Sequence, residues 1–190
     1  MKNNLDEYDK EVDVIIEISK GGHIKYEYDK EKNILICDRI LHTPFRYPFN
    51  YGFIPNTLSE DGDPVDAVVL MDDELLPGCS IKCKILGYLE TEDDEGNDPK
   101  LILCPIAKID PNFNPVNYSC ILNGSINYHT LEKIKYFFQH YKDLENKKVI
   151  VGEFRDKNKA IQIYTEALNR YNNKSIITEK NKITNYFDYI

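Results

Sequence analysis

The sequence predicts a fold of the α+β class that is mainly β, in which a closed or nearly closed barrel has helices packed on its outside. Strand-like apolar runs recur through residues 12–107, and apolar residues recur at helical spacing beyond residue 130. Many strands followed by two helices favour a sheet that closes on itself beneath helices. A chain of 190 residues also suits one domain with a sizeable core.

Six runs are expected to form strands. Residues 12–18 and 24–28 are typical of two strands joined by a turn at Gly21 and Gly22. The other runs are residues 33–38, 66–71, 79–89 and 101–107. Residues 43–56, rich in proline, glycine and aromatic side chains, are expected to be irregular, and residues 90–100 to form an acidic loop.

Two helices are expected after the strands. The first carries Leu131, Ile134, Phe138 and Tyr141 on one face, and the second carries Ile161, Tyr164, Leu168 and Tyr171. Asn158 is expected to cap the second helix. Residues 172–190 follow no clear pattern. The chain is therefore divided into a domain over residues 1–171 and a C-terminal extension, residues 172–190, of unknown role.

The composition argues against several classes of protein. The formal net charge is −8 without any block of Lys and Arg, whereas nucleic-acid-binding proteins usually have a basic face. No apolar run approaches the roughly 20 residues that span a bilayer, and the N-terminus lacks the apolar core of a secretory signal. A cytoplasmic protein is expected. The five cysteines lack zinc-site spacing and are expected to be buried, reduced thiols.

The most informative segment runs from Asp61 to Asp66 and places three carboxylates within six residues, just ahead of a strand. Such like charges repel one another unless water screens them or a divalent cation neutralises them. Short aspartate side chains suit the octahedral oxygen shell of Mg²⁺. An acidic surface turn explains these three residues equally well. A calcium loop of the EF-hand type does not, because its spacing differs.

A second acidic segment shifts this balance towards a metal site. The loop contains Glu90, Glu92, Asp93, Asp94, Glu95 and Asp98, with Lys100 just beyond it. Exposure to solvent accounts for some of these charges, notably Glu90, Glu92 and Glu95. Two acidic loops that feed one barrel could still converge on several metal ions.

Donors suited to a small anion are spread over the same chain. Alternation along residues 24–28 places Lys25 and Glu27 on one face of a strand. The other candidates are Arg39, Tyr47, Tyr51, Tyr141 and Lys142. Each alone has an ordinary explanation, since the charged residues could form surface pairs and the tyrosines could belong to the core. Only together do they indicate an anion site.

Taken together, these residues resemble the family I soluble inorganic pyrophosphatases from about residue 12 to about residue 170. The run from Asp61 to Asp66 is similar to the aspartate signature of that family without departure. Separate blocks follow in the family's order: Glu17, Lys25 to Glu27, Asp38 and Arg39, Tyr47 and Pro48, Asn50 to Ile54, Asp93 to Lys100, and His140 to Glu145.

The resemblance implies an OB-like five-stranded closed barrel with flanking strands and two C-terminal helices. It implies that several Mg²⁺ ions, or Mn²⁺, Zn²⁺ or Co²⁺ in their place, are bound by Asp61, Asp66, Asp93 and Asp98. By the same comparison Asp63 is the general base, and Glu17 and Glu27 act nearby through water or an additional metal. The implied substrate-binding residues are Lys25, Arg39, Tyr47, Tyr51, Lys100, Tyr141 and Lys142, of which Tyr47 supports the site and the others contact phosphate. The expected reaction is hydrolysis of magnesium-bound pyrophosphate by in-line attack of a metal-activated water, in a cytoplasmic homohexamer.

Two other functions remain open on the sequence alone. A barrel with 14 tyrosines could stack the bases of single-stranded nucleic acid, although acidic loops would repel the phosphate backbone. A chain of this kind could also bind divalent ions without turnover, although every expected catalytic position is filled. The expected partner is therefore a small-molecule substrate, and neither nucleic acid nor a membrane is expected.

Overall fold

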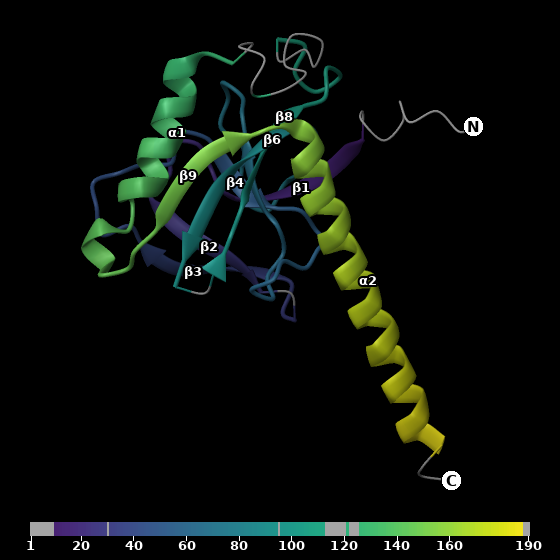
Figure 1. Cartoon of the computed structure of the whole chain (residues 1–190). Helices are drawn as coiled ribbons and strands as arrows, with labels where there is room; N and C mark the ends of the chain where they lie inside the picture. The colour runs from purple at the N-terminus through teal and green to yellow at the C-terminus, as the bar shows by residue number, and fades with distance from the viewer. Residues whose placement is uncertain (1–9, 30, 95, 113–120, 122–125, 188–190) are drawn as a thin grey trace.

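The computed structural model describes residues 10–29, 31–94, 96–112, 121 and 126–187, with side chains as far as Ile176. The strands gather in one body, α1 lies against one side of it, and α2 runs from the body to the far C-terminal end (Figure 1). The elements in chain order are β1 (Glu11–Ile18), β2 (Ile24–Asp29), β3 (Ile34–Ile40), β4 (Asn50–Phe53), β5 (Asp66–Val69), β6 (Ser80–Asp93), β7 (Gly96–Asn97), β8 (Lys100–Pro105), α1 (Tyr128–His140), the 3₁₀ turn η2 (Asp143–Glu145), β9 (Ile150–Arg155) and α2 (Lys157–Phe187).

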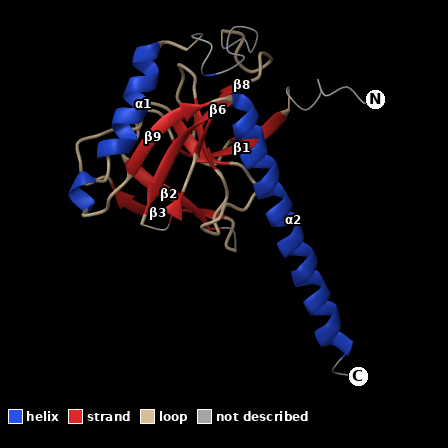
Figure 2. Cartoon of the chain, in the orientation of Figure 1, coloured by secondary structure: helices blue, strands red, loops and turns tan. Residues whose placement is uncertain are grey.

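Five of these strands close into a barrel in the order β1, β4, β5, β8 and β6, because β6 pairs back onto β1. The β5–β8 pair is parallel, and the other four pairs are antiparallel. β7 and β9 flank β6, while β2 and β3 form a separate two-stranded sheet. The predicted five-stranded closed barrel with flanking strands and two C-terminal helices is confirmed (Figure 2).

The pattern of β1 shows why the barrel forms. Its apolar residues Val12, Val14, Ile16 and Ile18 are buried, and the residues between them are exposed or partly buried. β4 approaches β1 so closely that a Cβ at Gly52 would lie 1.9 Å from the carbonyl oxygen of Ile15. Only glycine fits at this position, which brings the neighbouring Tyr51 to its place in the barrel wall.

Two apolar clusters hold the helices to the barrel. Ala160, Ile161 and Tyr164 of α2 belong to one cluster, together with barrel residues such as Leu101. Phe137 and Phe138 of α1 belong to the other, together with residues of the segment that leads into β4. The second cluster therefore fixes the C-terminal end of α1 beside the barrel. None of the described helices is both long and apolar enough to cross a membrane.

The structure corrects two expectations about elements. β4 lies within residues 43–56, which are predicted to be irregular, and that prediction is wrong for Asn50–Phe53. All four residues of β4 are buried, so no alternation marks the strand. The cap of α2 is Asp156 rather than Asn158, because its Oδ1 accepts a hydrogen bond from the Lys159 N–H at 3.0 Å. The backbone of α2 continues to Phe187, so residues 172–187 are helical despite their lack of pattern.

The cysteines differ from one another in exposure. Cys83 and Cys104 are buried, as expected, and Cys79 is partly buried. Cys37 is exposed, so the expectation of a buried thiol is wrong there. It lies on β3, in a sheet of only two strands, which leaves much of its surface open to solvent. Cys120 lies outside the described residues.

Candidate active site

A polar cavity of about 330 Å³ lies beside the barrel. Seven acidic and five basic side chains line it: Glu17, Glu27, Asp61, Asp63, Asp66, Asp93 and Asp98, with Lys25, Arg39, Lys100, Lys142 and Lys147. Tyr26, Tyr28, Tyr51, Phe53, Pro64 and Tyr141 complete the wall. Both acidic segments of the sequence, far apart along the chain, therefore supply side chains to one cavity.

The parallel pairing of β5 and β8 brings the centre of the cavity together. Ala67 pairs with Leu101, so Asp66 and Lys100, the first residues of the two strands, lie side by side. The buried Lys100 ammonium donates hydrogen bonds to Asp66 and Asp98. Burial acts to lower the pKa of Lys100, but the charges of the two carboxylates outweigh it and raise the pKa above its ordinary value.

A tight turn presents the other two aspartates of the first acidic segment. Gly62 has a φ of 96°, in the left-handed region that favours glycine. The Asp63 N–H donates to Asp61 Oδ1 at 2.9 Å, and the Ser59 N–H donates to the Asp63 carbonyl at 2.6 Å. These bonds hold the backbone of the turn and leave the Asp63 side chain exposed at the mouth of the cavity.

The second acidic segment is held by its own short pairing. Asp93 ends β6, which pairs with β7 across the connection. The Asp98 N–H donates to the Thr91 carbonyl at 2.9 Å, and the Thr91 hydroxyl donates to the Asp98 carbonyl. These bonds fix the loop so that the Asp98 carboxylate reaches Lys100.

Burial of so many carboxylates shifts their acidity. Burial raises the pKa of Glu17 to about 7, although the Tyr28 N–H donates to its Oε1 at 2.8 Å; the charge of Asp66 adds to the rise. Burial also raises the pKa of Asp98 to about 7, against the effect of Lys100, and raises that of Asp61. Repulsion and lost hydration of this kind are what a bound cation relieves.

The charge balance of the cavity also favours bound cations. Seven carboxylates against five cations leave a formal excess of two negative charges in the cavity. A small polyanion would be repelled unless divalent cations entered with it. Carboxylate oxygens are the donors that hard cations such as Mg²⁺ prefer, so the donor set fits such ions. Among the described residues, no group of three acidic, histidine or cysteine side chains is already arranged around one point. The Lys100 ammonium instead pairs with both Asp66 and Asp98.

The predicted anion-binding cations lie on two walls. Lys25 Nζ is 2.6 Å from Glu27 Oε1 on the β2–β3 hairpin, so these two residues share a face as expected. On another wall, after α1, Lys142 Nζ is 3.4 Å from Asp93 Oδ2. Burial lowers the pKa of Lys142, against the effect of Asp93. Each cation thus lies beside a carboxylate.

Tyr47 is the one predicted substrate-binding residue that does not line the cavity. Its side chain is buried, with its ring 5.5 Å from that of Tyr51 and 6.4 Å from that of Tyr141. Tyr47 therefore packs against two rings that do line the cavity and can support them. Burial raises the pKa of all three hydroxyls, so each remains a neutral donor.

Several lining residues escape the sequence prediction. Tyr26, Tyr28, Phe53, Pro64 and Lys147 have no role assigned from the sequence, yet all line the cavity. Lys147 follows Asn146, whose left-handed φ of 54° turns the chain after η2. In the sequence, only the basic pair Lys147 and Lys148, just after residues 140–145, indicates a role for Lys147, and that signal is weak.

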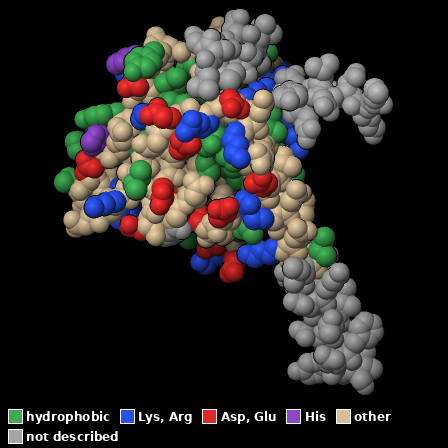
Figure 3. Space-filling model, in the orientation of Figure 1, with side chains coloured by type: hydrophobic (Ala, Val, Ile, Leu, Met, Phe, Trp, Pro, Cys, Tyr) green, Lys and Arg blue, Asp and Glu red, His purple; other side chains and the backbone are tan. Residues whose placement is uncertain are grey.

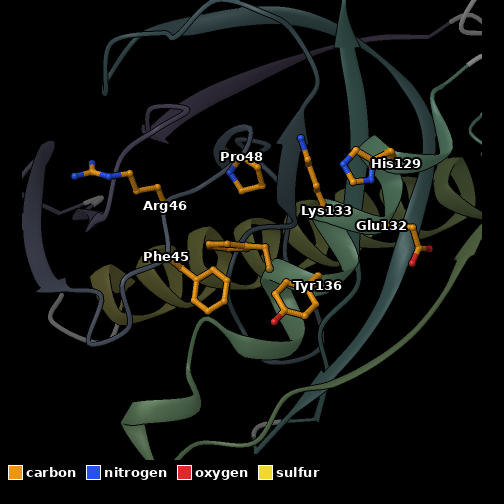
Figure 4. Close-up of a pocket in the computed structure, with 8 residues that line it drawn as sticks. Phe45, Arg46, Pro48, His129, Glu132, Lys133 and Tyr136 are labelled. Atoms are coloured by element: carbon orange, nitrogen blue, oxygen red, sulfur yellow. The ribbon is translucent and has the colours of Figure 1, made fainter.

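A second cavity of about 400 Å³ lies between residues 45–48 and α1, and it is mostly apolar. The rings of Phe45 and Tyr136 lie beside each other, 5.9 Å apart, and Arg46 points away from them (Figure 4). Glu132, Lys133 and His129 of α1 complete its wall together with Pro48 and Phe137. Its single carboxylate, Glu132, offers no cluster for cations.

Comparisons with known proteins are consistent with a functional site in the polar cavity. The profile described as inorganic pyrophosphatase matches residues 14–172. The inorganic pyrophosphatase of Helicobacter pylori is 49% identical over 159 residues, which is 83% of this chain and 90% of that protein. The chain belongs to the inorganic pyrophosphatase family. Pyrophosphate hydrolysis is the activity of this family.

Other inorganic pyrophosphatases share the fold as well as the sequence. The one from Xylella fastidiosa is 45% identical over 89% of this chain and 92% of its own. The solved structure of the Helicobacter pylori pyrophosphatase superposes with a TM-score of 0.82 at 46% identity, covering 90% of this chain and 99% of that one. That of Coxiella burnetii gives 0.81 at 38% identity, with coverage of 85% and 95%.

Proposed function

We propose that this protein is a metal-dependent inorganic diphosphatase that hydrolyses pyrophosphate to two orthophosphates. The observation that carries the proposal is the convergence of seven carboxylates and five cations on one cavity in a chain of this family. Neither a nucleic-acid groove nor a purely structural ion site would need so many groups of both signs. On the face seen in Figure 3, acidic and basic side chains are interspersed, without a basic patch for a phosphate backbone.

Divalent cations, with Mg²⁺ as the proposed metal and Mn²⁺, Zn²⁺ or Co²⁺ as substitutes, would be held by Asp61, Asp66, Asp93 and Asp98. When bound, such ions lower the pKa of water and neutralise phosphate oxygens. Asp66 lies nearest the centre of this set, since its charge acts on Glu17, Asp61 and Asp98. We assign it the largest share of cation binding.

The remaining side chains divide the chemistry between them. Asp63, exposed on its turn, would accept a proton from the attacking water, which approaches the phosphorus in line with the leaving group. Glu17 and Glu27 would hold further water at the same end of the cavity. The donors proposed to bind and neutralise the phosphates are Lys25, Arg39, Lys100, Tyr51, Tyr141 and Lys142, with Tyr47 supporting the two tyrosines. Catalysis would then consist of positioning and charge stabilisation, without a covalent enzyme intermediate.

Release of orthophosphate from pyrophosphate tests this function. The purified protein should release phosphate with Mg²⁺, stop with excess EDTA, and resume when Mg²⁺ is restored. Mn²⁺, Zn²⁺ and Co²⁺ should restore part of the activity. Protein that leaves pyrophosphate intact with each of these metals would refute the proposal.

We also propose that the enzyme acts in the cytoplasm as a homohexamer, as the family resemblance implies. Light scattering after size-exclusion chromatography should give six chains of 22.2 kDa per particle, and a smaller particle would refute the hexamer. Cell fractionation would test the location.

The catalytic domain is proposed to be residues 1–171, because the family profile ends at residue 172. A chain that stops after Tyr171 should keep its full activity.

A further inference from the structure

Arg39, at the end of β3, is held between two carboxylates. Its Nε lies 2.6 Å from Asp38 Oδ2, and its Nη1 lies 2.5 Å from Glu145 Oε2. Burial acts to lower the pKa of Arg39, but these two hydrogen bonds outweigh it and raise the pKa. A guanidinium is a rigid plane of five donors, so two fixed donors also fix the direction of the others. Arg39 lines the polar cavity, and its remaining donors are available there.

The two carboxylates differ sharply in their surroundings. Asp38 is the sequence neighbour of Arg39, 29% of its side chain is exposed, and Lys25 Nζ lies 3.6 Å from it. Glu145 is 106 residues away in η2, only 4% of its side chain is exposed, and its Oε1 is buried without a hydrogen-bond partner. Asp38 thus interacts with Lys25 and solvent as well as with Arg39. Among the described residues, Arg39 is the only ion-pair partner found for Glu145.

A half-satisfied buried carboxylate is a poor source of stability. Desolvation of the charge costs roughly what the ion pair returns, and the unpaired oxygen adds to the cost. The pair instead links two walls of the cavity, since Arg39 belongs to the β2–β3 hairpin and Glu145 follows Tyr141 and Lys142 at the end of α1. This geometry gives Glu145 a role that burial alone does not explain.

We propose that Glu145 is a positioning residue that fixes the Arg39 guanidinium for the phosphate in the cavity, which rests on the function proposed above. Glu145 does not line the cavity. It acts through Arg39, and it also keeps the hairpin wall at a fixed distance from the wall that carries Tyr141 and Lys142. Loss of its charge should leave Arg39 able to rotate about its side chain.

The test is a double-mutant cycle of Glu145→Gln and Arg39→Gln, with Asp143→Asn as the matched control. Asp143 is in the same 3₁₀ turn, but it pairs with His140 at the surface. Phosphate release at saturating Mg²⁺ gives kcat and KM. Binding of imidodiphosphate, a pyrophosphate analogue with a nitrogen bridge, gives a second readout, and thermal unfolding checks the fold of each variant.

Glu145→Gln is expected to lower kcat by about ten-fold, as a displaced phosphate ligand would, and to weaken imidodiphosphate binding, with little loss of thermal stability. In the Arg39→Gln background the same change should cost less than about two-fold, and Asp143→Asn should behave as wild type. Full additivity, or lost stability with unchanged kcat and binding, would overturn the inference. Wild-type protein that binds imidodiphosphate but releases no phosphate would refute the proposed function, and binding by Glu145→Gln would then decide the inference. Wild-type protein that neither binds nor hydrolyses would overturn both.

Discussion

The apolar cavity is lined by α1 and the polar cavity by the residues just after it, but the two differ in kind. The apolar cavity beside Phe45 and Tyr136 is similar in volume to the polar one, at about 400 Å³ against about 330 Å³. One short segment and one helix form it, whereas residues from both sheets, three loops and the segment just after α1 line the polar cavity. Volume therefore does not mark the functional site in this protein. What marks it is the number of charges that the fold gathers from distant parts of the chain.

An aromatic layer separates the two cavities. The Phe137 ring lines the apolar cavity and lies 4.6 Å from that of Tyr47, which packs beneath Tyr51 and Tyr141 of the polar one. Such packing holds a rigid wall behind the charges. Changes to charged groups on either side of this layer should therefore differ in their effect on activity.

The largest effect is expected at the centre of the polar cavity. Asp66→Asn should lower kcat roughly 1,000-fold, because several kcal/mol of charge stabilisation depends on the cations that this residue helps to hold. Phosphate release at saturating Mg²⁺ measures it. A loss no greater than that caused by Lys142→Ala would contradict the central place given to Asp66.

The next largest effect is expected for Asp63→Asn, which should lower kcat by about 100-fold. This is the lower end of the range for loss of a general base. Because Asp63 is exposed on its turn, metal binding should remain partly intact. Isothermal titration with Mn²⁺ separates the two effects. Near-wild-type kcat across the pH range would remove Asp63 as the base.

Glu17→Gln should change stability with pH in metal-free protein. The folded-state pKa of Glu17 is raised from 4.5 to about 7, mainly by burial. Below pH 4.5 the carboxyl is protonated in both the folded and the unfolded chain, so it costs nothing. Between pH 4.5 and 7 the unfolded chain ionises first, and the free energy of unfolding of the wild type falls. Above pH 7 the variant should be more stable by about 2 kcal/mol, discounted from the full shift for partial exposure.

Urea unfolding in EDTA at pH 5 and pH 8.5 measures this difference. In the Glu17→Gln variant the Tyr28 N–H can still donate to the amide oxygen of the new side chain, so the backbone contact is kept. Parallel pH profiles for the two proteins would show that burial of Glu17 carries no such cost.

The smallest effect compares one lysine from each cavity. Lys142→Ala should raise KM for magnesium-bound pyrophosphate about ten-fold, as loss of one charged hydrogen bond does. Lys133→Ala, on the wall of the apolar cavity, should leave kcat and KM within about two-fold of wild type. Equal changes at the two positions would end the distinction between the cavities.

The sequence predicts those parts of the fold in which one pattern dominates. Alternation along β1 and the spacing of α1 are visible because each element has one buried face. β4 is missed because it is buried on every side, and Gly52 is needed for a contact with β1 that no local pattern reveals. The residues of the Asp61–Asp66 turn are likewise found from their types and spacing.

The contacts of the site are harder to predict, because they depend on distant pairings. The parallel register of β5 and β8 sets Lys100 against Asp66, 34 residues away. The partner of Arg39 is 106 residues away in a three-residue turn. Tyr47 lies behind the cavity wall, and a tyrosine beside a site and one behind it look alike in sequence. Residue type identifies the chemistry, but only the closed barrel determines which residues meet.

Both acidic segments should hold divalent cations jointly, and the binding of Mn²⁺ measures this without depending on turnover. Electron paramagnetic resonance of free Mn²⁺, titrated with wild-type protein, Asp66→Asn, Asp98→Asn and the double variant, gives the affinity of each. We predict that either single change weakens binding by about ten-fold or more and that the double variant loses less than the two losses combined. Unchanged affinity in either single variant would contradict the claim.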